Sequence, residues 1–195
     1  MIPANTRGPG GVIVRYGDPE AAHVLSVYAD LRCPYCKRME LDLGAVMERA
    51  ADEGRFAVDH HFGTFIDDAA GGSGSLEALA ALGAAADEGQ KPFMHFLRAL
   101  YADQPSEEVD AFADRDTLLR LADGVEALHT DGFRQKVGER TYLPWAAQVS
   151  AAFGTSGVRS TPTVLIDRSP VPVINALGYA VTPEAFLAEV ADVTG

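Results

Sequence analysis

The sequence predicts an α/β fold in which a mixed central sheet is interrupted by an inserted helical domain. Strand and helix patterns alternate over residues 1–66, only helix patterns occur over residues 67–155, and strand patterns return over residues 156–195 before a last helix. We therefore expect an N-terminal β-α-β part, a helical insertion and a C-terminal β-β-α part. The last two strands are close enough in sequence to form an antiparallel hairpin, so the sheet should be mixed.

The N-terminal part has the pattern of two strands, a helix and a third strand. Residues 12–16 and 24–28 are short β-like runs, and residues 56–62 form another. Residues 34–53 carry apolar side chains at spacings of three and four, namely Met39, Leu43, Val46 and Met47, which predicts a helix. Pro34 suits the first turn of that helix, where a missing backbone N–H costs nothing.

The middle of the chain predicts roughly four or five helices. The Gly-Gly-Ser-Gly run over residues 71–74 is expected to be a flexible loop. Predicted helices follow over residues 76–88, 92–101 and 116–121, with one or two more over residues 130–153. The last range is divided near Pro144. We expect Trp145 and Phe153 to belong to the core of this insertion.

The end of the chain returns to strands. Residues 163–167 and 173–177 have strand patterns, and Thr182 begins a final helix. Thr182 suits the N-cap of that helix and Pro183 suits its first position, so the start of the helix is well marked.

The formal net charge of −12 limits the classes of partner. A general nucleic-acid binder needs a surplus of basic side chains to neutralise phosphates, and this chain has 16 Lys and Arg against 28 Asp and Glu. The same deficit disfavours docking on anionic membranes. No apolar run approaches the ~18 residues that span a bilayer. We therefore expect neither nucleic-acid partners nor membrane insertion.

The first eleven residues give an expectation for the cellular location of the protein. They are polar and rich in Gly and Pro, and they lack the charged start and apolar stretch of a secretory signal. The expectation is a cytoplasmic protein. If the chain is instead a truncated mature form, a periplasmic or extracellular location is expected.

The only two cysteines, Cys33 and Cys36, form one C-x-x-C motif at the predicted start of a helix. The unsatisfied N–H groups of a first helical turn and the helix dipole favour the thiolate of the first cysteine. A thiolate is the species that attacks a disulfide, and the second cysteine lies close enough to resolve the mixed disulfide. We therefore predict redox catalysis, with Cys33 as the nucleophile and Cys36 as the resolving thiol.

Two other uses of the motif stay open. A C-x-x-C pair is also half of a zinc site, which His60 and His61 would have to complete. Adjacent strand residues point to opposite faces, so both histidines cannot easily reach one metal. The cysteines can also be inert. His95 and His129 have no acid–base partner in the sequence, and we expect neither a metal nor a cofactor.

Several motifs together resemble the bacterial DsbA family of thioredoxin-like proteins. They are Cys-Pro-Tyr-Cys at a helix start, the helical insertion, and Gly-Val-Arg-Ser-Thr-Pro-Thr over residues 157–163 before a β-β-α ending. The resemblance extends from about Val12 to Val193. It implies a thioredoxin-like fold, thiol–disulfide exchange, and a cis bond before Pro162, which in this family packs against the active-site disulfide. The alternative is an ordinary trans proline at a strand entry.

The sequence departs from the family pattern at two points. Thioredoxins and the founding DsbA proteins carry a buried acid six residues before the first cysteine, where this chain has Val27. Asp30 is nearer to Cys33 and is a candidate for part of that role, or else a loop residue that caps or turns the chain. The Pro-Tyr dipeptide is that of glutaredoxins, which leaves the oxidising strength open.

The remaining site residues are assigned from their positions around the motif. Pro34, Tyr35, Thr161 and Pro162 are expected to shape the substrate side of the site. Arg32 and Asp30 are expected to tune the thiol pKa values, because a positive charge near Cys33 favours its thiolate. The alternative for Arg32 is a solvated side chain, and Lys37 and Arg38 also flank the motif.

The function predicted is disulfide exchange with cysteine-containing protein substrates or small thiols, together with an unidentified redox partner. One rival is a glutathione-dependent transferase or isomerase of the same fold, but such enzymes typically replace the second cysteine, and this chain retains Cys36. The other rival is a non-catalytic thioredoxin-fold binding module, which would show no reactive thiol at neutral pH.

Overall fold

A six-stranded sheet forms the centre of the protein in the computed structural model, which describes residues 1–195. The strand order is β1-β2-β4-β3-β5-β6. Strands β3 and β4 are parallel and every other neighbouring pair is antiparallel, so the predicted mixed sheet is confirmed. The strands are β1 (Thr6–Arg7), β2 (Ile13–Tyr16), β3 (Val24–Asp30), β4 (Ala57–Gly63), β5 (Thr163–Ile166) and β6 (Ser169–Pro170).

The helical insertion lies between β4 and β5 in the chain. It contains six α-helices, more than the four or five expected, because α2 carries too few residues to show a helical period. The predicted boundary at residue 67 falls inside α2. The helices are α1 (Pro34–Asp52), α2 (Phe65–Ala70), α3 (Gly74–Glu88), α4 (Gln90–Ala102), α5 (Arg115–Ala122), α6 (Asp131–Gly138), α7 (Leu143–Thr155) and α8 (Pro183–Thr194).

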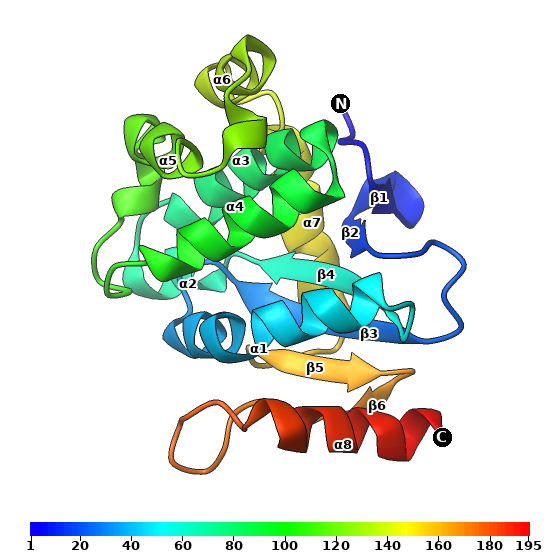
Figure 1. Ribbon diagram of the computed structural model, residues 1–195. Helices are drawn as coiled ribbons and strands as arrows, with labels where there is room; N and C mark the ends of the chain where they lie inside the picture. The colour runs from blue at the N-terminus through cyan, green and yellow to red at the C-terminus, as the bar shows by residue number, and fades with distance from the viewer.

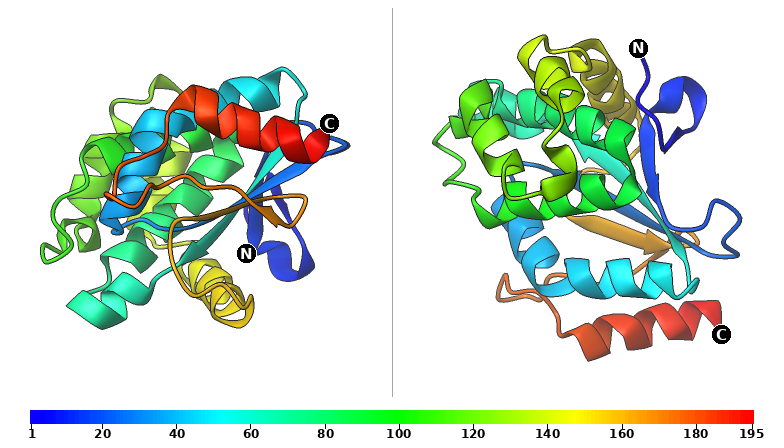
Figure 2. Two further views of the ribbon diagram at one scale, coloured as in Figure 1. Left: turned by 90° about the horizontal axis from the view of Figure 1, so that it is seen from below. Right: turned by 45° about the horizontal axis from the view of Figure 1, so that its top comes forward.

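Helices cover both faces of the sheet (Figures 1 and 2). On one face α7 packs against β4, and the ring of Tyr28 on β3 meets Phe153 of α7 edge-on, with 5.9 Å between ring centroids. The other face is covered by α1 and α4, while α8 lies beside α1 and β5. Trp145 and Phe153 are both buried, as expected for core residues.

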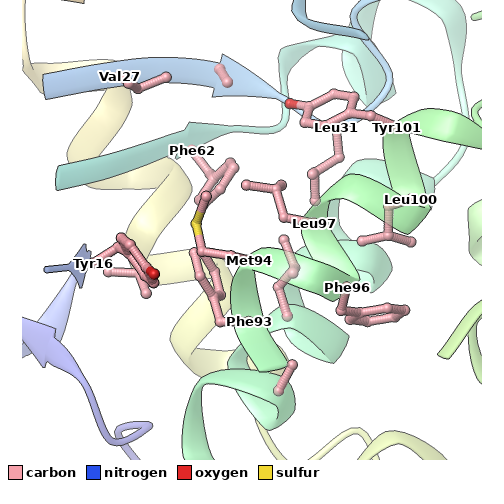
Figure 3. Packing of buried hydrophobic residues seen from close by; sticks show 14 of the residues in the cluster. Tyr16, Val27, Leu31, Phe62, Phe93, Met94, Phe96, Leu97, Leu100 and Tyr101 are labelled. Carbon is pink, nitrogen blue, oxygen red and sulfur yellow. The ribbon is translucent and has the colours of Figure 1, made fainter. Parts of the chain in front are cut away.

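The insertion and the sheet share one hydrophobic core. Figure 3 shows Met94 and Leu97 of α4 reaching towards Phe62 of β4 and Leu31, which follows β3. All four side chains are almost fully buried. The helical insertion is therefore packed onto the strand ends from which the C-x-x-C motif starts.

The strand predicted over residues 173–177 is wrong. Strand β5 pairs instead with the two residues of β6, and Pro170 and Pro172 lack the N–H groups that a longer ladder requires. Residues 174–180 form a tight hairpin closed by a single bridge between Ile174 and Ala180, which we call the 174–180 hairpin. This hairpin lies next to the site described below.

Candidate active site

The C-x-x-C motif lies at the start of α1, directly after β3. Cys33 is the N-cap of α1, and its carbonyl accepts the first helical hydrogen bond from the N–H of Lys37 at 3.1 Å. Cys36 lies one turn inside the helix and is fully buried, while Cys33 is 5 % exposed. Both cysteines are free thiols, so the structure describes the dithiol form.

The loop before β5 lies against Cys33 because β5 runs antiparallel to β3. Tyr28 pairs with Thr163, so the residues before Thr163 continue past the end of β3 towards the motif. The Cys33 Sγ lies 3.6 Å from the carbonyl oxygen of Thr161. The peptide bond between Thr161 and Pro162 is cis.

The site favours the thiolate of Cys33. Its pKa is lowered to about 6, chiefly by a hydrogen bond from the Cys36 thiol, although burial acts in the opposite direction. The Thr161 side chain and the backbone N–H groups of Tyr35 and Cys36 lower the pKa further. The Thr161 hydroxyl is buried and has no hydrogen-bond partner, so it is free to bond to the sulfur. These groups meet at the first turn of α1, where a helix stabilises negative charge.

Cys36, in contrast to Cys33, keeps its proton. Burial raises its pKa well above the ordinary value, and the neighbouring Cys33 charge raises it further. The Asp30 backbone and the Thr161 side chain only partly offset this rise. The pair therefore combines one thiol that ionises near neutral pH with one that keeps its proton.

The expected role of Arg32 requires a correction. Its side chain is buried and points into the helical insertion, where it binds Asp67 at 2.8 Å and the carbonyls of Gly71 and Glu107 at 2.9 and 2.6 Å. Asp110 lies 3.1 Å away. The guanidinium is thus neither solvated nor directed at the cysteine. The lowered pKa of Cys33 arises from the hydrogen bonds described above.

The Asp30 side chain has the capping role given above as its alternative, while the Asp30 backbone lowers the pKa of Cys36. Its buried carboxylate accepts hydrogen bonds from the Ser75 hydroxyl at 2.6 Å and from the N–H groups of Arg32 and Ile66 at 2.9 and 3.1 Å. Burial raises the pKa of this carboxyl. The Asp30 carbonyl also accepts from the Tyr101 hydroxyl at 3.2 Å, so the residue joins β3 to the insertion.

Gln104 is a site residue that the sequence did not reveal. Its side-chain amide donates to the carbonyl of Leu31 at 2.7 Å and to that of Cys33 at 3.2 Å. Its own backbone carbonyl accepts from the Lys37 ammonium at 2.9 Å. The only sequence signal is a polar residue just beyond a predicted helix, and nothing in the spacing connects it to the cysteines.

Glu40 is a second residue that the sequence analysis missed. It lies four positions after Cys36 on α1, which places both residues on the same side of the helix. Its carboxyl is buried, which raises its pKa to about 7, and the nearest positive charge is Arg98 at 3.8 Å. Val27, by contrast, is a buried apolar residue of β3. A buried carboxyl is therefore present close to the motif, but on the helix instead of the strand.

A groove of about 380 Å³ adjoins the motif. It is lined by Tyr35, Thr161 and Pro162 on one side and by the 174–180 hairpin on the other. Tyr35 and its neighbour Pro34 are both exposed, but Pro34 does not line the groove. The groove thus brings together Tyr35, Thr161 and Pro162, three of the four residues that were expected to face a substrate.

The histidines lie away from the thiols. His60 is buried beside the rings of Phe62 and Phe93, and burial lowers its pKa to about 3. His61 points to the opposite face and stacks on Tyr28, with 4.3 Å between ring centroids. The structure holds no cluster of three or more His, Cys, Asp or Glu side chains arranged to bind a metal. None of its helices combines the length and apolarity needed to cross a bilayer.

Solved structures with this fold include several disulfide oxidoreductases. The reduced form of DsbA from Mycobacterium tuberculosis matches with a TM-score of 0.73 and 26 % identity, covering 94 % of this chain and 92 % of that one. DsbG from the same organism matches with a TM-score of 0.75 and 26 % identity, covering 96 % and 89 %. BdbD from Bacillus subtilis shares the fold with a TM-score of 0.74 and 16 % identity over the whole of both chains.

Sequence comparison gives the family. No curated protein matches the chain in sequence. The model of the family described as thioredoxin matches residues 10–186, which is most of the chain. This chain therefore belongs to the thioredoxin family and has the fold of the DsbA-type thiol–disulfide oxidoreductases.

Proposed function

We propose that this DsbA-like thiol–disulfide oxidoreductase exchanges disulfides with cysteine-containing proteins, with Cys33 as the nucleophile and Cys36 as the resolving thiol. The assignment of these two roles rests on the opposite shifts of the two pKa values. The pKa of Cys33 is lowered to about 6, and that of Cys36 is raised well above the ordinary value. A thiol that ionises near neutral pH is the one that attacks or leaves in disulfide exchange.

In the oxidising direction, a substrate thiolate attacks the Cys33 sulfur of the Cys33–Cys36 disulfide. A substrate–Cys33 bond forms, and Cys36 leaves and takes up a proton, which its raised pKa favours. A second substrate thiolate then attacks the substrate sulfur of the mixed disulfide, and Cys33 leaves as the thiolate. Two electrons pass from the substrate dithiol to the protein. The reducing direction is the reverse, with Cys33 attacking and Cys36 resolving.

The loop around Pro162 supports a peptide as the substrate. The Thr161 N–H donates to no acceptor within the protein, and Thr161 lies beside the Cys33 sulfur. An extended peptide can pair with such a free backbone group as an added strand. Pro34 and Tyr35, exposed next to this edge, would contact the same peptide.

Two observations weigh against the rival functions. A glutathione-dependent transferase or isomerase has no use for a second cysteine one helical turn away, yet Cys36 is present and hydrogen-bonded to Cys33. A binding module without chemistry has no need of a thiol whose pKa is about 6. Small thiols are alternative substrates of the proposed reaction, and its redox partner is unidentified.

The proposed compartment lies outside the cytoplasm. DsbA-type proteins typically work there, and the comparisons lend no support to the cytoplasmic location expected from the N-terminal residues. A periplasmic or extracellular location is compatible with them. Fractionation of the native host with an antibody against the protein tests this, and recovery with cytosolic markers alone would contradict it.

The exchange reaction is tested by trapping. Cys36→Ser, incubated with a disulfide-containing peptide, is expected to accumulate a mixed disulfide on Cys33 that mass spectrometry detects. Cys33→Ser is expected to trap nothing, because Cys36 is buried and protonated. Trapping on Cys36 instead would reverse the two roles. The absence of any adduct, with an unreactive thiol at neutral pH, would favour the binding module.

A further inference from the structure

The sulfur of Cys36 has to carry a negative charge inside the protein during exchange. It leaves as a thiolate when Cys33 is attacked, and it attacks as a thiolate when it resolves a mixed disulfide. Yet Cys36 is fully buried, and burial raises its pKa well above the ordinary value. The Asp30 backbone and the Thr161 side chain lower that pKa, but both are uncharged. One more hydrogen-bond donor at this sulfur would therefore speed the exchange.

The hydroxyl of Tyr101 lies in the same part of the core. Tyr101 belongs to α4 of the helical insertion and is 1 % exposed. Figure 3 shows its ring beside Leu31, with the hydroxyl directed at the end of β3. There the hydroxyl donates to the Asp30 carbonyl at 3.2 Å, while the backbone of the same residue lowers the pKa of Cys36. The phenol and the buried thiol therefore both adjoin Asp30.

The charge of the sulfurs acts on this hydroxyl. Burial raises the pKa of Tyr101 well above its ordinary value, and the charge of Cys36 raises it further, ahead of that of Cys33. Tyr101 therefore keeps its proton at neutral pH and is a hydrogen-bond donor. The same negative charge that opposes ionisation of the phenol attracts its O–H group, so a thiolate at Cys36 competes with the Asp30 carbonyl for this donor.

The bond that Tyr101 makes in the dithiol form can be exchanged at little cost. Its length of 3.2 Å exceeds the ~2.5–3.0 Å that is usual when a hydroxyl donates to an oxygen. The Asp30 carbonyl also accepts from the N–H of Cys33 at 3.1 Å, so it keeps a partner when the hydroxyl turns away. Rotation of the hydroxyl redirects its proton without moving the buried ring.

We propose that the Tyr101 hydroxyl turns from the Asp30 carbonyl to the Cys36 sulfur whenever that sulfur is a thiolate. This rests on the proposed exchange function. In the oxidising direction the substrate–Cys33 bond forms, the Cys33–Cys36 bond breaks, and its electron pair stays on Cys36. Tyr101 donates a hydrogen bond to this thiolate and keeps its own proton, until a proton from water converts Cys36 to the thiol. The reducing direction retraces these steps, so the same hydrogen bond assists both.

The test compares rates with equilibria in Tyr101→Phe, which removes only the hydroxyl. Reduction of the oxidised protein by dithiothreitol and oxidation of the reduced protein by oxidised glutathione are each followed over a single turnover by acid quench and thiol labelling. We expect both rates to fall about tenfold, as for the loss of one hydrogen bond to a charged group. The reduction potential and the pKa of Cys33 are expected to keep their wild-type values, because neither stable redox form uses this bond.

Two controls separate this role from a structural one. In Cys36→Ser, which lacks the second sulfur, adding Tyr101→Phe is expected to leave the rate of mixed-disulfide formation at Cys33 unchanged. Tyr142→Phe removes the hydroxyl of another buried tyrosine, which donates to Asp87, and is expected to keep both wild-type rates. Unchanged rates in Tyr101→Phe, or an equal loss in the Cys36→Ser background, would overturn the proposal. If the wild type exchanges with neither reagent, the exchange function itself fails.

Discussion

The carbonyl oxygen of Thr161 lies 3.6 Å from the sulfur of Cys33, although the two residues are 128 positions apart in the chain. The antiparallel pairing of β5 with β3 produces this contact, because it brings the loop before β5 to the end of the strand that leads into the motif. The nucleophile therefore has the first turn of α1 on one side and a loop from the C-terminal part of the chain on the other.

Removal of the Thr161 hydroxyl should raise the pKa of Cys33. This hydroxyl is buried and has no hydrogen-bond partner, and the Thr161 side chain lowers the pKa of Cys33. Thr161→Val keeps the shape of the side chain, so we expect a rise on the order of one pKa unit. Titration of the thiolate absorbance measures it. Thr155→Val, whose hydroxyl bonds only to carbonyls of its own helix, is the control, and an equal shift there would contradict the assignment.

The reduced protein should gain stability relative to the oxidised protein as the pH rises. The folded pKa of Cys33, about 6, lies below its unfolded value near 9, so its contribution is complete above the unfolded pKa and is lost as the pH falls through 6. Urea unfolding of both redox forms at about pH 5 and about pH 8 measures the difference. The raised pKa of Cys36 acts in the opposite sense only at higher pH. A difference that does not change with pH would refute the lowered pKa.

The reduction potential of the Cys33–Cys36 pair should lie above thioredoxin's ~−270 mV, in the range of glutaredoxins or higher. Stabilising the Cys33 thiolate favours the reduced form, and Val27 contributes no negative charge to oppose it. Equilibration in glutathione buffers gives the value. A potential clearly below that of thioredoxin would show that the charge argument is wrong and that the protein is a reductase.

Glu40 should make the protein less stable at high pH. Its folded pKa of about 7 exceeds the unfolded value of 4.5, so its contribution is complete below pH 4.5 and is lost as the pH rises through 7. Glu40→Gln should remove this dependence, which amounts to about 3 kcal/mol between the two limits. Urea unfolding across this range tests it. The exposed Glu189→Gln is the control, and a parallel decline of wild type and Glu40→Gln would exclude the effect.

Gln104 should stabilise the start of α1. Gln104→Ala removes both hydrogen bonds to the carbonyls of Leu31 and Cys33 and is expected to cost about 1–3 kcal/mol in the free energy of unfolding. Chemical denaturation measures the loss. Gln148→Ala, on the exposed surface of α7, should cost much less. Equal stability of the two variants would mean that these hydrogen bonds contribute nothing net.

The sequence predicted the parts of the fold that local patterns control. The apolar spacing after Pro34 predicted α1, and the Thr182-Pro183 pair predicted the start of α8, where the Thr182 hydroxyl accepts from the N–H of Ala185. The strand over residues 173–177 was wrong because apolar residues alone do not show that neighbouring prolines prevent pairing. A β-like composition predicts a strand only where a partner can bond to it.

In the candidate site too, local motifs predicted some residues, while others depend on contacts between distant parts of the chain. The motif itself predicts Cys33 and Cys36 as the reactive pair, and the Thr-Pro pair before a strand, together with the family resemblance, predicts a role for Pro162. Sequence proximity misled for Arg32, since the residue beside a nucleophile can point away from it, as its contacts with Asp67 show. Gln104 was missed because its link to Cys33 spans 71 positions and depends on how the insertion folds back.

That link through Gln104 has a consequence for any attempt to shorten the protein. The insertion contacts the motif directly. Gln104 of the insertion donates to the backbone carbonyls of Leu31 and Cys33, and the Glu107 carbonyl of the insertion accepts from the side chain of Arg32. Excising the extra helices would leave the motif in the sequence while releasing the segment that presents it. The redox properties of the Cys33–Cys36 pair therefore depend on the inserted helices, and a version of the protein without them would have different redox properties.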